Sequence, residues 1–432
     1  MEGMFQTMRN AWKIADLRKK LLFTVAMLIV FRIGSHIPIP GLDPVKFREL
    51  IDKFGGQIGG FLDIVSGGAF KNVTIFAMSI TPYINSSIII QLLTVAIPSL
   101  ERLAKEGEEG RKILAQYIRY GTILLGFLQA AALYLGMRTA IIGGPNVLNF
   151  ITITLTFTAG TAFLMWLGEK ITEFGIGNGI SLIIFAGIVS RGPQGAKTLI
   201  NYYNAGALIS KGIAGVLAIV LILVVFVAII AAVIWVQQAE RRIPIQYAKR
   251  VVGRKMYGGQ STHLPIKVNL SGVMPIIFAM SIMAFPSTII QFFAASSTNK
   301  IVLWFKDSQG SLSYALIYAV LIVFFTFFYS VIQFNPIEIA NNMKKNGGFI
   351  PGLRPGKPTS DYISKVLNRI TWFGGFFLAG ITLFPSLMGM ALNIQGIWFG
   401  GTAVLILVGV ALDTVKQMES QMLMRHYKGF LE

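Results

Sequence analysis

The sequence has no cysteine, three histidines and few charged residues. Of its 432 residues, 13% are charged and 54% are hydrophobic, and the mean hydropathy is +0.65. The absence of cysteine excludes disulfide bonds, thiol catalysis and thiolate metal sites. The histidines, His36, His263 and His426, are far apart in the sequence and show no metal-ligand spacing. We therefore expect neither a metal site nor a cofactor, and we do not expect an enzyme.

Acidic residues are also scarce, with 19 Asp and Glu against 38 Lys and Arg, which gives a net charge of +19. In a soluble protein this excess would suggest nucleic-acid binding. A soluble domain of this size could not bury so much apolar surface, so lipid must surround much of the chain. The positive charge then has a simpler explanation, because lysine and arginine collect in the cytoplasmic loops of membrane proteins.

Long apolar runs recur ten times along the chain. Each approaches the roughly 20 residues that a helix needs to cross about 30 Å of hydrocarbon. The run at 179–199 is the weakest because SRGPQG interrupts it, so this span is expected to be tilted, broken or lined by protein. The predicted spans are 21–38, 73–97, 117–137, 150–171, 179–199, 212–237, 272–293, 312–334, 370–392 and 396–417.

With ten spans, both termini lie on the same side of the membrane. That side carries 26 of the 38 lysines and arginines and the other side carries 10, which predicts cytoplasmic termini. Two long loops on the cytoplasmic side, 238–271 and 335–369, have seven and six basic residues against one and two acidic ones. Apolar and aromatic residues lie among these charges, a composition that suits docking to an acidic protein or to RNA.

The spacing of the spans suggests two related halves. Because each half has five spans, an odd number, the second half has the opposite orientation in the membrane to the first. A long connection follows span 1 (39–72) and another follows span 6 (238–271), at corresponding positions on opposite sides of the membrane. This pattern is typical of an inverted repeat, with the functional site at the interface between halves. The predicted parts are residues 1–200, residues 201–418 and a cytoplasmic tail, 419–432.

Ionisable residues are missing from the centres of the spans. Arg32, Glu169, Lys170 and Asp413 all lie near span ends. Proton-driven carriers place such groups at membrane depth, so their absence argues against this class. It argues less strongly against a sodium-coupled carrier, which could use backbone carbonyls. An inverted-repeat transporter for a small solute therefore remains as an alternative.

One fragment does not fit either a span or an ordinary loop. Residues 59–72 read GGFLDIVSGGAFKN, which is too short and glycine-rich to cross a membrane and too apolar for an exposed loop. The fragment also contains an acid, Asp63, within its apolar part. The paired glycines on both sides supply hinges at low steric cost.

Several long motifs resemble the SecY family of translocon channel subunits. They are RIGSHIPIPG (32–41), SGGAFKNVTIFAMSITPYINSSIIIQLL (66–93), FLMWLGEKITEFGIGNGISLIIFAGIV (163–189), ERRIPIQYAKR (240–250), QSTHLPIKVNLSGVMP (260–275) and FIPGLRPGKPT (349–359), in the same order as in the family. The resemblance implies an all-α polytopic membrane protein with ten transmembrane helices in two inverted five-helix halves around a central pore, with a short plug helix. It implies a protein-conducting channel that carries unfolded secretory polypeptides across the bacterial plasma membrane and releases transmembrane segments sideways into lipid.

The resemblance also assigns a pore ring and a plug. Isoleucines four residues apart share a helix face, and an apolar collar contacts any polypeptide without selecting a sequence while it resists wetting by ions. The implied ring is Ile80, Ile84, Ile180, Ile184, Ile277 and Ile406. The implied plug, about 57–72, includes Phe61, Leu62, Asp63, Ile64, Val65, Ser66, Gly67 and Gly68. The role of Asp63 in the plug is the least explained of these.

A lateral gate and a docking surface complete the expected sites. The gate would lie between spans 2 and 7, at Asn85, Ser86, Ser87, Gln91, Met274 and Phe278. The polar residues of span 2 lie beyond Pro82, and they fit a face that meets water or a partner. The contacts for SecA or the ribosome would be Arg250, Arg254, Lys255 and Arg354. The implied partners are the small subunits SecE and SecG, the ATPase SecA, the translating ribosome, signal sequences with their nascent chains, and membrane lipids.

Overall fold

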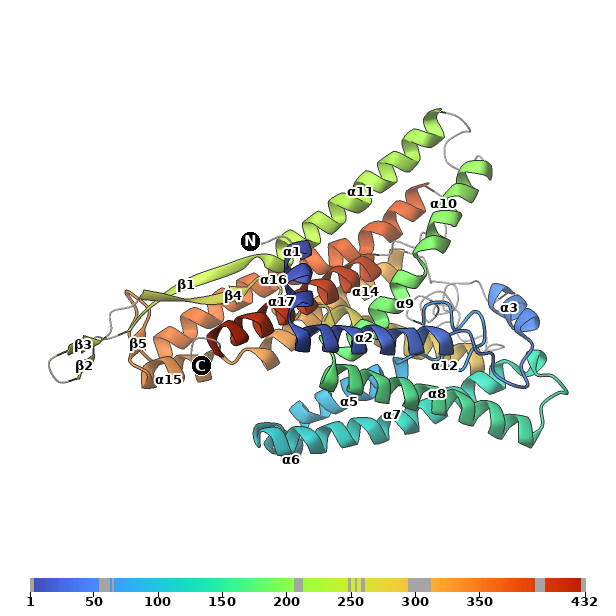
Figure 1. Ribbon diagram of the computed structural model, residues 1–432, viewed down its shortest axis with the longest axis horizontal. Helices are drawn as coiled ribbons and strands as arrows, with labels where there is room; N and C mark the ends of the chain where they lie inside the picture. Colours follow the sequence, from blue (N-terminus) through green and yellow to red (C-terminus); the bar gives the residue numbers. More distant parts are fainter. Residues whose placement is uncertain are drawn as a thin grey trace.

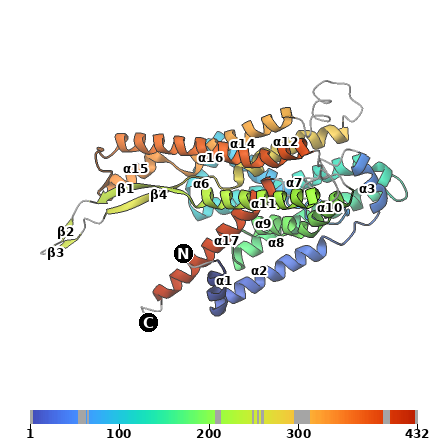
Figure 2. The same ribbon diagram turned by 90° about the horizontal axis from the view of Figure 1, so that it is seen from above.

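The computed structural model describes residues 4–53, 63, 66–205, 213–247, 250–252, 255–257, 261–293, 312–392 and 401–428. Within these residues the chain forms a bundle of long helices, from which a β-ribbon projects at one end (Figure 1). Viewed from above, α14 (Leu312–Gln333) and α16 (Lys357–Leu392) lie along one side of the bundle and α2 (Ala15–Gly34) along the other (Figure 2). Both halves of the chain therefore contribute to one bundle.

A helix lies in each of the ten predicted spans. In the first half these are α2, α5 (Thr81–Ala96), α7 (Glu108–Gly136), α8 (Val147–Phe174), and α9 (Gly179–Ser190) with α10 (Gly192–Ala205). In the second half they are α11 (Ile213–Gln238), α12 (Met274–Phe293), α14, α16 and α17 (Gly401–Lys428). Shorter elements connect them: α1 (Met4–Lys13), α3 (Pro44–Lys53), α6 (Pro98–Lys105), η1 (Arg138–Ala140) and α15 (Pro336–Lys345).

Length and apolarity alone identify fewer spans than ten. Six helices of the described chain qualify, or seven if α5 and α6, which are bent by 103° at their junction, count as one broken span. α2 falls short because it carries a cluster of charges at its start, and α9 because it ends after 12 residues. The helices are therefore consistent with ten spans, although α2, α9 and α12 do not qualify by length and apolarity and α5 qualifies only together with α6.

Span 2 starts later than its sequence predicts. Residues 66–80 form consecutive turns, and the helix begins at Thr81 with Pro82 in its first turn, where the fixed φ of proline favours helix initiation. In the segment of the expected plug helix, Asp63 is helical and residues 66–72 form turns. Gly67 and Gly68 have φ of 65° and 91°, a left-handed conformation that cannot continue a right-handed helix.

The two basic loops, 238–271 and 335–369, contain a small β-sheet that the all-α prediction did not include. β1 (Glu240–Tyr247) pairs antiparallel with β4 (Ser261–Lys267) and, at its end, with β5 (Gly348–Phe349). β2 (Arg250–Val252) and β3 (Lys255–Tyr257) form the tip of the ribbon. Alternation explains the strand, because Ile243 and Ile245 are buried while their neighbours are exposed. These isoleucines pack with Ile363 and Leu367 of α16, which anchors the ribbon to the bundle.

Candidate functional site

The six predicted ring isoleucines belong to one hydrophobic cluster. Ile80, Ile184 and Ile406 are buried in it, and Ile84, Ile180 and Ile277 are partly buried against it. They come from α5 and the residue before it, α9, α12 and α17, so four elements from both halves of the chain meet here. The cluster therefore brings the predicted ring residues together at the interface between the halves.

A cavity of about 520 Å³ borders this cluster. Ile184, Ile277 and Ile406 line its apolar part. The rest of its lining is mixed. The apolar residues are Leu270, Val273, Met274, Val410 and Leu412, and the polar ones, from α17, from the segment between β4 and α12 and from the ends of α11, β4 and α14, include Gln237, Lys267, Asn269, Ser271, Gln333, Asp413, Thr414, Lys416, Gln417 and Ser420. We call this cavity the vestibule; polar side chains and three of the predicted ring isoleucines line it together.

Ile180 has a different environment from Ile184. It lines a second cavity, of about 590 Å³, together with Tyr83, Trp166 and the ion-paired Glu169. A Cβ atom placed on Gly168 of α8 would collide with the Ile180 side chain, so Ile180 packs closely on α8. Although the two isoleucines are four residues apart, Ile180 thus faces α8 while Ile184 faces the vestibule.

The described part of the plug segment lies against the isoleucine cluster. Ala69 is completely buried and belongs to the same cluster. Phe70 packs edge-on against Phe47 of α3, and Ser66 is buried and accepts a hydrogen bond from the Phe70 N–H at 3.0 Å. Four predicted plug residues lie outside the described residues: Phe61, Leu62, Ile64 and Val65.

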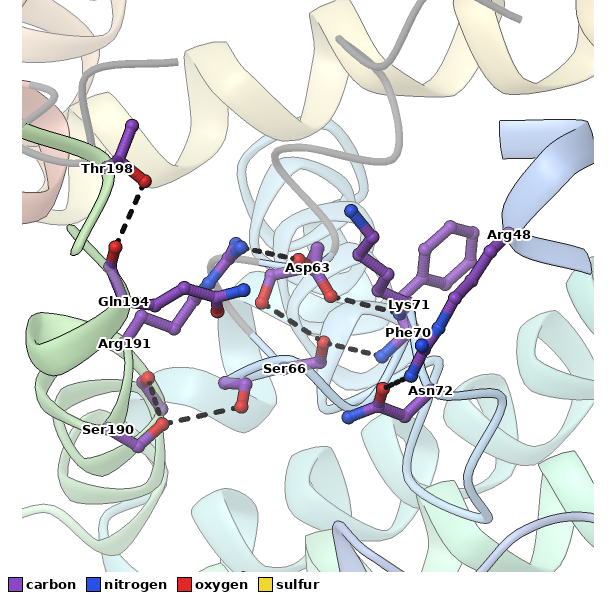
Figure 3. A network of polar contacts seen from close by, with 12 residues as sticks. Arg48, Asp63, Ser66, Phe70, Lys71, Asn72, Ser190, Arg191, Gln194 and Thr198 are labelled. Atoms are coloured by element: carbon purple, nitrogen blue, oxygen red, sulfur yellow. Dashed lines mark hydrogen bonds and ion pairs between the residues drawn. The ribbon is translucent and has the colours of Figure 1, made fainter. Parts of the chain in front are cut away.

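Asp63 is the polar centre of this segment. It is 4% exposed, and its Oδ2 lies 2.7 Å from Nη2 of Arg191, which follows α9. Its Oδ1 accepts a hydrogen bond from the Lys71 N–H at 2.9 Å. Figure 3 shows Arg191 and Lys71 on opposite sides of the Asp63 carboxylate. Arg191 was not among the predicted site residues, because only the folded chain brings it to Asp63.

The predicted gate residues divide between two faces of α5. The Gln91 Oε1 accepts a hydrogen bond from the Tyr329 hydroxyl of α14 at 3.2 Å. Phe278 of α12 is buried and packs edge-on against Tyr329. Ser86 instead donates to the Ile118 carbonyl of α7 at 2.8 Å, so it faces α7.

The remaining gate residues are less specifically placed. Asn85 and Ser87 are half-buried on α5. Met274, the first residue of α12, lines the vestibule. The start of α12 thus lies at the vestibule, and α12 also packs on α5.

The predicted docking residues lie at the ribbon end of the molecule. Arg250 is in β2 and Lys255 in β3, at the tip of the ribbon (Figure 1). Arg354 is exposed in the turn between β5 and α16, where its carbonyl accepts a hydrogen bond from the Thr359 hydroxyl at 2.9 Å. Arg254 lies outside the described residues. Among the described residues, no group of three or more His, Asp or Glu side chains could hold a metal ion.

Comparison with known proteins gives consistent matches over the whole chain. The SecY family model matches residues 74–415. The protein translocase subunit SecY of Halalkalibacterium halodurans is 48% identical, and the alignment covers 99% of this chain and all of the relative. The subunit of the same name from Thermotoga maritima is 47% identical over 99% of this chain and 98% of the relative.

Solved structures share the fold. One is described as showing that the plug domain of SecY stabilises the closed state of the translocation channel and maintains a membrane seal. Its TM-score is 0.64 at 20% identity, and the match covers 94% of this chain and 92% of that chain. A structure of a protein-conducting channel gives 0.61 at 18% identity with the same coverage. The chain belongs to the SecY family of protein translocase subunits.

Proposed function

We propose that the chain forms the protein-conducting channel through which unfolded secretory polypeptides cross the membrane, and from which transmembrane segments pass sideways into lipid. One observation carries this proposal: Ile184, Ile277 and Ile406 line the vestibule together with many polar residues, and Ala69 of the plug segment belongs to the same cluster as these isoleucines. A hydrophilic entrance that meets a narrow apolar constriction suits passage of a polypeptide of any sequence.

The ring isoleucines act as the seal around the translocating chain. Isoleucine offers no hydrogen bonds, so it makes contact with each passing residue without holding it. In the resting state the same side chains resist wetting, which keeps ions out. Ile184, Ile277 and Ile406 are the central members because they line the vestibule, whereas Ile180 supports α9 through its contact with α8.

The plug segment closes the channel from the opposite side of the constriction. Ala69 contributes to the isoleucine cluster, and Phe70 holds the segment against α3. Because these contacts are local and residues 66–72 form turns, the segment can leave the constriction without the unfolding of a transmembrane helix.

The gate lies between α5 and α12, with α14 behind it. Asn85, Ser87, Gln91, Met274 and Phe278 form this boundary, and Ser86 contributes to the packing of α5 on α7. Separation of α5 from α12 would expose a signal helix to the vestibule on one side and to lipid on the other. The alternative of a small-solute transporter is not supported, because the relatives are translocase subunits and the similar folds are protein channels.

The protein is a multi-pass membrane protein, and its partners are proposed from its charge and its relatives. SecA and the ribosome dock at the basic ribbon, through Arg250, Arg254 and Lys255, and at Arg354. A ribosome-bound canine Sec61 channel has a similar fold, with a TM-score of 0.58. SecE and SecG pack on the membrane-facing surface. The membrane is the bacterial plasma membrane, and both termini lie in the cytoplasm. The two halves that separate at the gate are residues 1–200 and 201–418. The chain has no catalytic role of its own, and SecA supplies the energy.

Site-specific crosslinking tests this function directly because the sequence has no cysteine. Ile277→Cys and Ile406→Cys variants are reconstituted with SecE, SecG and SecA, and a secretory precursor carrying one cysteine is arrested during translocation. Both variants are expected to form a disulfide with the arrested precursor. Val224→Cys is the control, because Val224 of α11 is 60% exposed on the outside of the bundle. Equal crosslinking from Val224→Cys, or none from the two ring positions, would overturn the proposal.

A further inference from the structure

Two arginines contact the plug segment: Arg32, near the end of α2, and Arg191, directly after α9. We infer that Arg191 and Arg32 are positioning residues that fix the closed position of the plug segment, Arg191 through the Asp63 carboxylate and Arg32 through the Gly67 carbonyl. This inference rests on the proposed role of the segment as the channel's plug. It assigns a function to Asp63, the one acid in residues 57–72.

The Asp63–Arg191 pair is shielded from water. The side chains are 6% and 16% exposed, and the Oδ2–Nη2 distance is 2.7 Å. The second carboxylate oxygen is occupied by the Lys71 N–H, and the Asp63 carbonyl accepts the Gly68 N–H at 2.9 Å. Asp63 thus organises the turn that follows it while its side chain connects that turn to the end of α9.

Arg191 is distinguished from the other cations around Asp63. Lys71 bonds the Asp63 side chain through its main-chain N–H. Arg48 of α3 donates to the Asn72 side chain. Arg191 is the cation that forms an ion pair with Asp63 in the described residues, and it directly follows α9, the helix that carries the ring residue Ile184. The pair therefore ties the plug segment to an element of the constriction.

The second anchor is at Gly67. Arg32, near the end of α2, donates from Nη1 to the Gly67 carbonyl at 2.9 Å and to the Ser190 hydroxyl at 3.2 Å. A Cβ atom on Gly67 would lie 2.8 Å from the Ser190 oxygen and 2.9 Å from Cα of Gly187. The plug backbone thus approaches α9 as closely as a glycine allows, and the two anchors, four residues apart, define both its position and its direction.

The chemistry of a buried ion pair suits a part that must leave its place. The attraction inside the protein is largely offset by the loss of hydration, so the intact pair adds little net stability, whereas removal of one partner leaves a buried unpaired charge and is strongly unfavourable. When the plug segment moves away, Asp63 and Arg191 both regain water. The pair therefore specifies the closed position without making departure difficult.

The test measures the resting ion conductance of the channel, with SecE and SecG, in planar bilayers. Arg191→Gln is expected to raise the resting conductance several-fold, because the Asp63 carboxylate is left buried without its partner. Two double variants are expected to return the conductance to near the wild-type level: the charge exchange Asp63→Arg with Arg191→Asp, and the apolar pair Asp63→Leu with Arg191→Met. Arg138→Gln, an exposed arginine in η1, is the matched control and should leave the conductance unchanged.

A translocation assay on the same vesicles keeps the two proposals apart. Translocation of a secretory precursor by Arg191→Gln shows that the variant is folded and that the channel function holds. An unchanged conductance in such an active variant overturns the inference alone. The inference is also overturned if Arg138→Gln leaks equally, or if neither double variant restores the seal. Failure of the wild-type chain to translocate would instead contradict the proposed function.

Discussion

The Tyr329 hydroxyl of α14 donates a hydrogen bond to the Gln91 side chain of α5 at 3.2 Å, and this bond joins the two halves of the chain. Phe278 of α12 packs edge-on against the Tyr329 ring, so the same tyrosine also supports the proposed gate helix. A polar contact in this position stabilises the closed arrangement of α5 and α14. It is therefore expected to influence which segments leave the channel for the lipid.

Tyr329→Phe should lower the apolarity that a segment needs for insertion into lipid. The loss of one hydrogen bond of about 0.5–1.5 kcal/mol destabilises the closed gate, so the gate opens more readily. The measurement uses a series of test segments with increasing leucine content and records the content at half-maximal insertion. Tyr318→Phe is the control on the same helix, because the Tyr318 hydroxyl is buried without a hydrogen-bond partner in the described chain. A threshold that moves equally in both variants would contradict a role for the bond.

Ile184→Gly should raise the resting ion conductance more than Ile180→Gly does. Both changes place a glycine in α9, Ile180 in its first turn and Ile184 in its interior. Ile184 lines the vestibule, whereas Ile180 packs on α8, so the first change widens the constriction and the second leaves it lined. Single-channel recordings in planar bilayers would check this order, and equal conductances would show that Ile180 belongs to the constriction as the sequence spacing predicts.

The close approach of α8 to the turns of residues 66–80 gives a prediction for stability. A Cβ atom on Gly160 would collide with the Ile75 carbonyl oxygen, and backbone cannot move as a side chain can. Gly160→Ala should therefore destabilise the protein by about 1–3 kcal/mol. Gly380→Ala in α16 has open space around it and should stabilise the protein by about 0.5–1 kcal/mol. Thermal unfolding midpoints of both variants in detergent would test this. A midpoint of Gly380→Ala below that of the wild type would contradict the expectation that alanine is tolerated where space is open.

The ten spans could be predicted because the thickness of the membrane imposes a local signal on the sequence. A helix lies in every predicted span, including the broken fifth, where α9 ends at Ser190 and α10 begins at Gly192. The turns of residues 66–80 could not be predicted in this way, because their apolar residues resemble the start of a span. Their shape depends on Gly67, Gly68 and contact with Gly160 of α8.

Contacts between distant residues limited the prediction of the site. Helical spacing grouped Ile180 with Ile184, but the absence of a side chain at Gly168 lets Ile180 pack on α8. The Asp63–Arg191 pair joins residues more than 100 positions apart, so no local pattern reveals it. The strand β1 did carry a local signal, because Ile243 and Ile245 alternate with polar or exposed residues as in a strand. The sequence prediction for this loop used its charge instead.

Arg354→Glu should abolish SecA-driven translocation while the variant still inserts into the membrane at the wild-type level. The side chain of Arg354 is exposed in the turn before α16. The hydrogen bond of this turn joins the Thr359 hydroxyl to the main-chain carbonyl of residue 354, which the substitution keeps, so the fold should not change. Reversal of the charge places repulsion where an acidic partner surface is expected to dock. Lys357→Glu, an exposed charge reversal three residues further along, is the matched control and should retain translocation. The comparison uses inverted membrane vesicles with added SecA and a secretory precursor, and full translocation by Arg354→Glu would exclude this turn from the SecA contact.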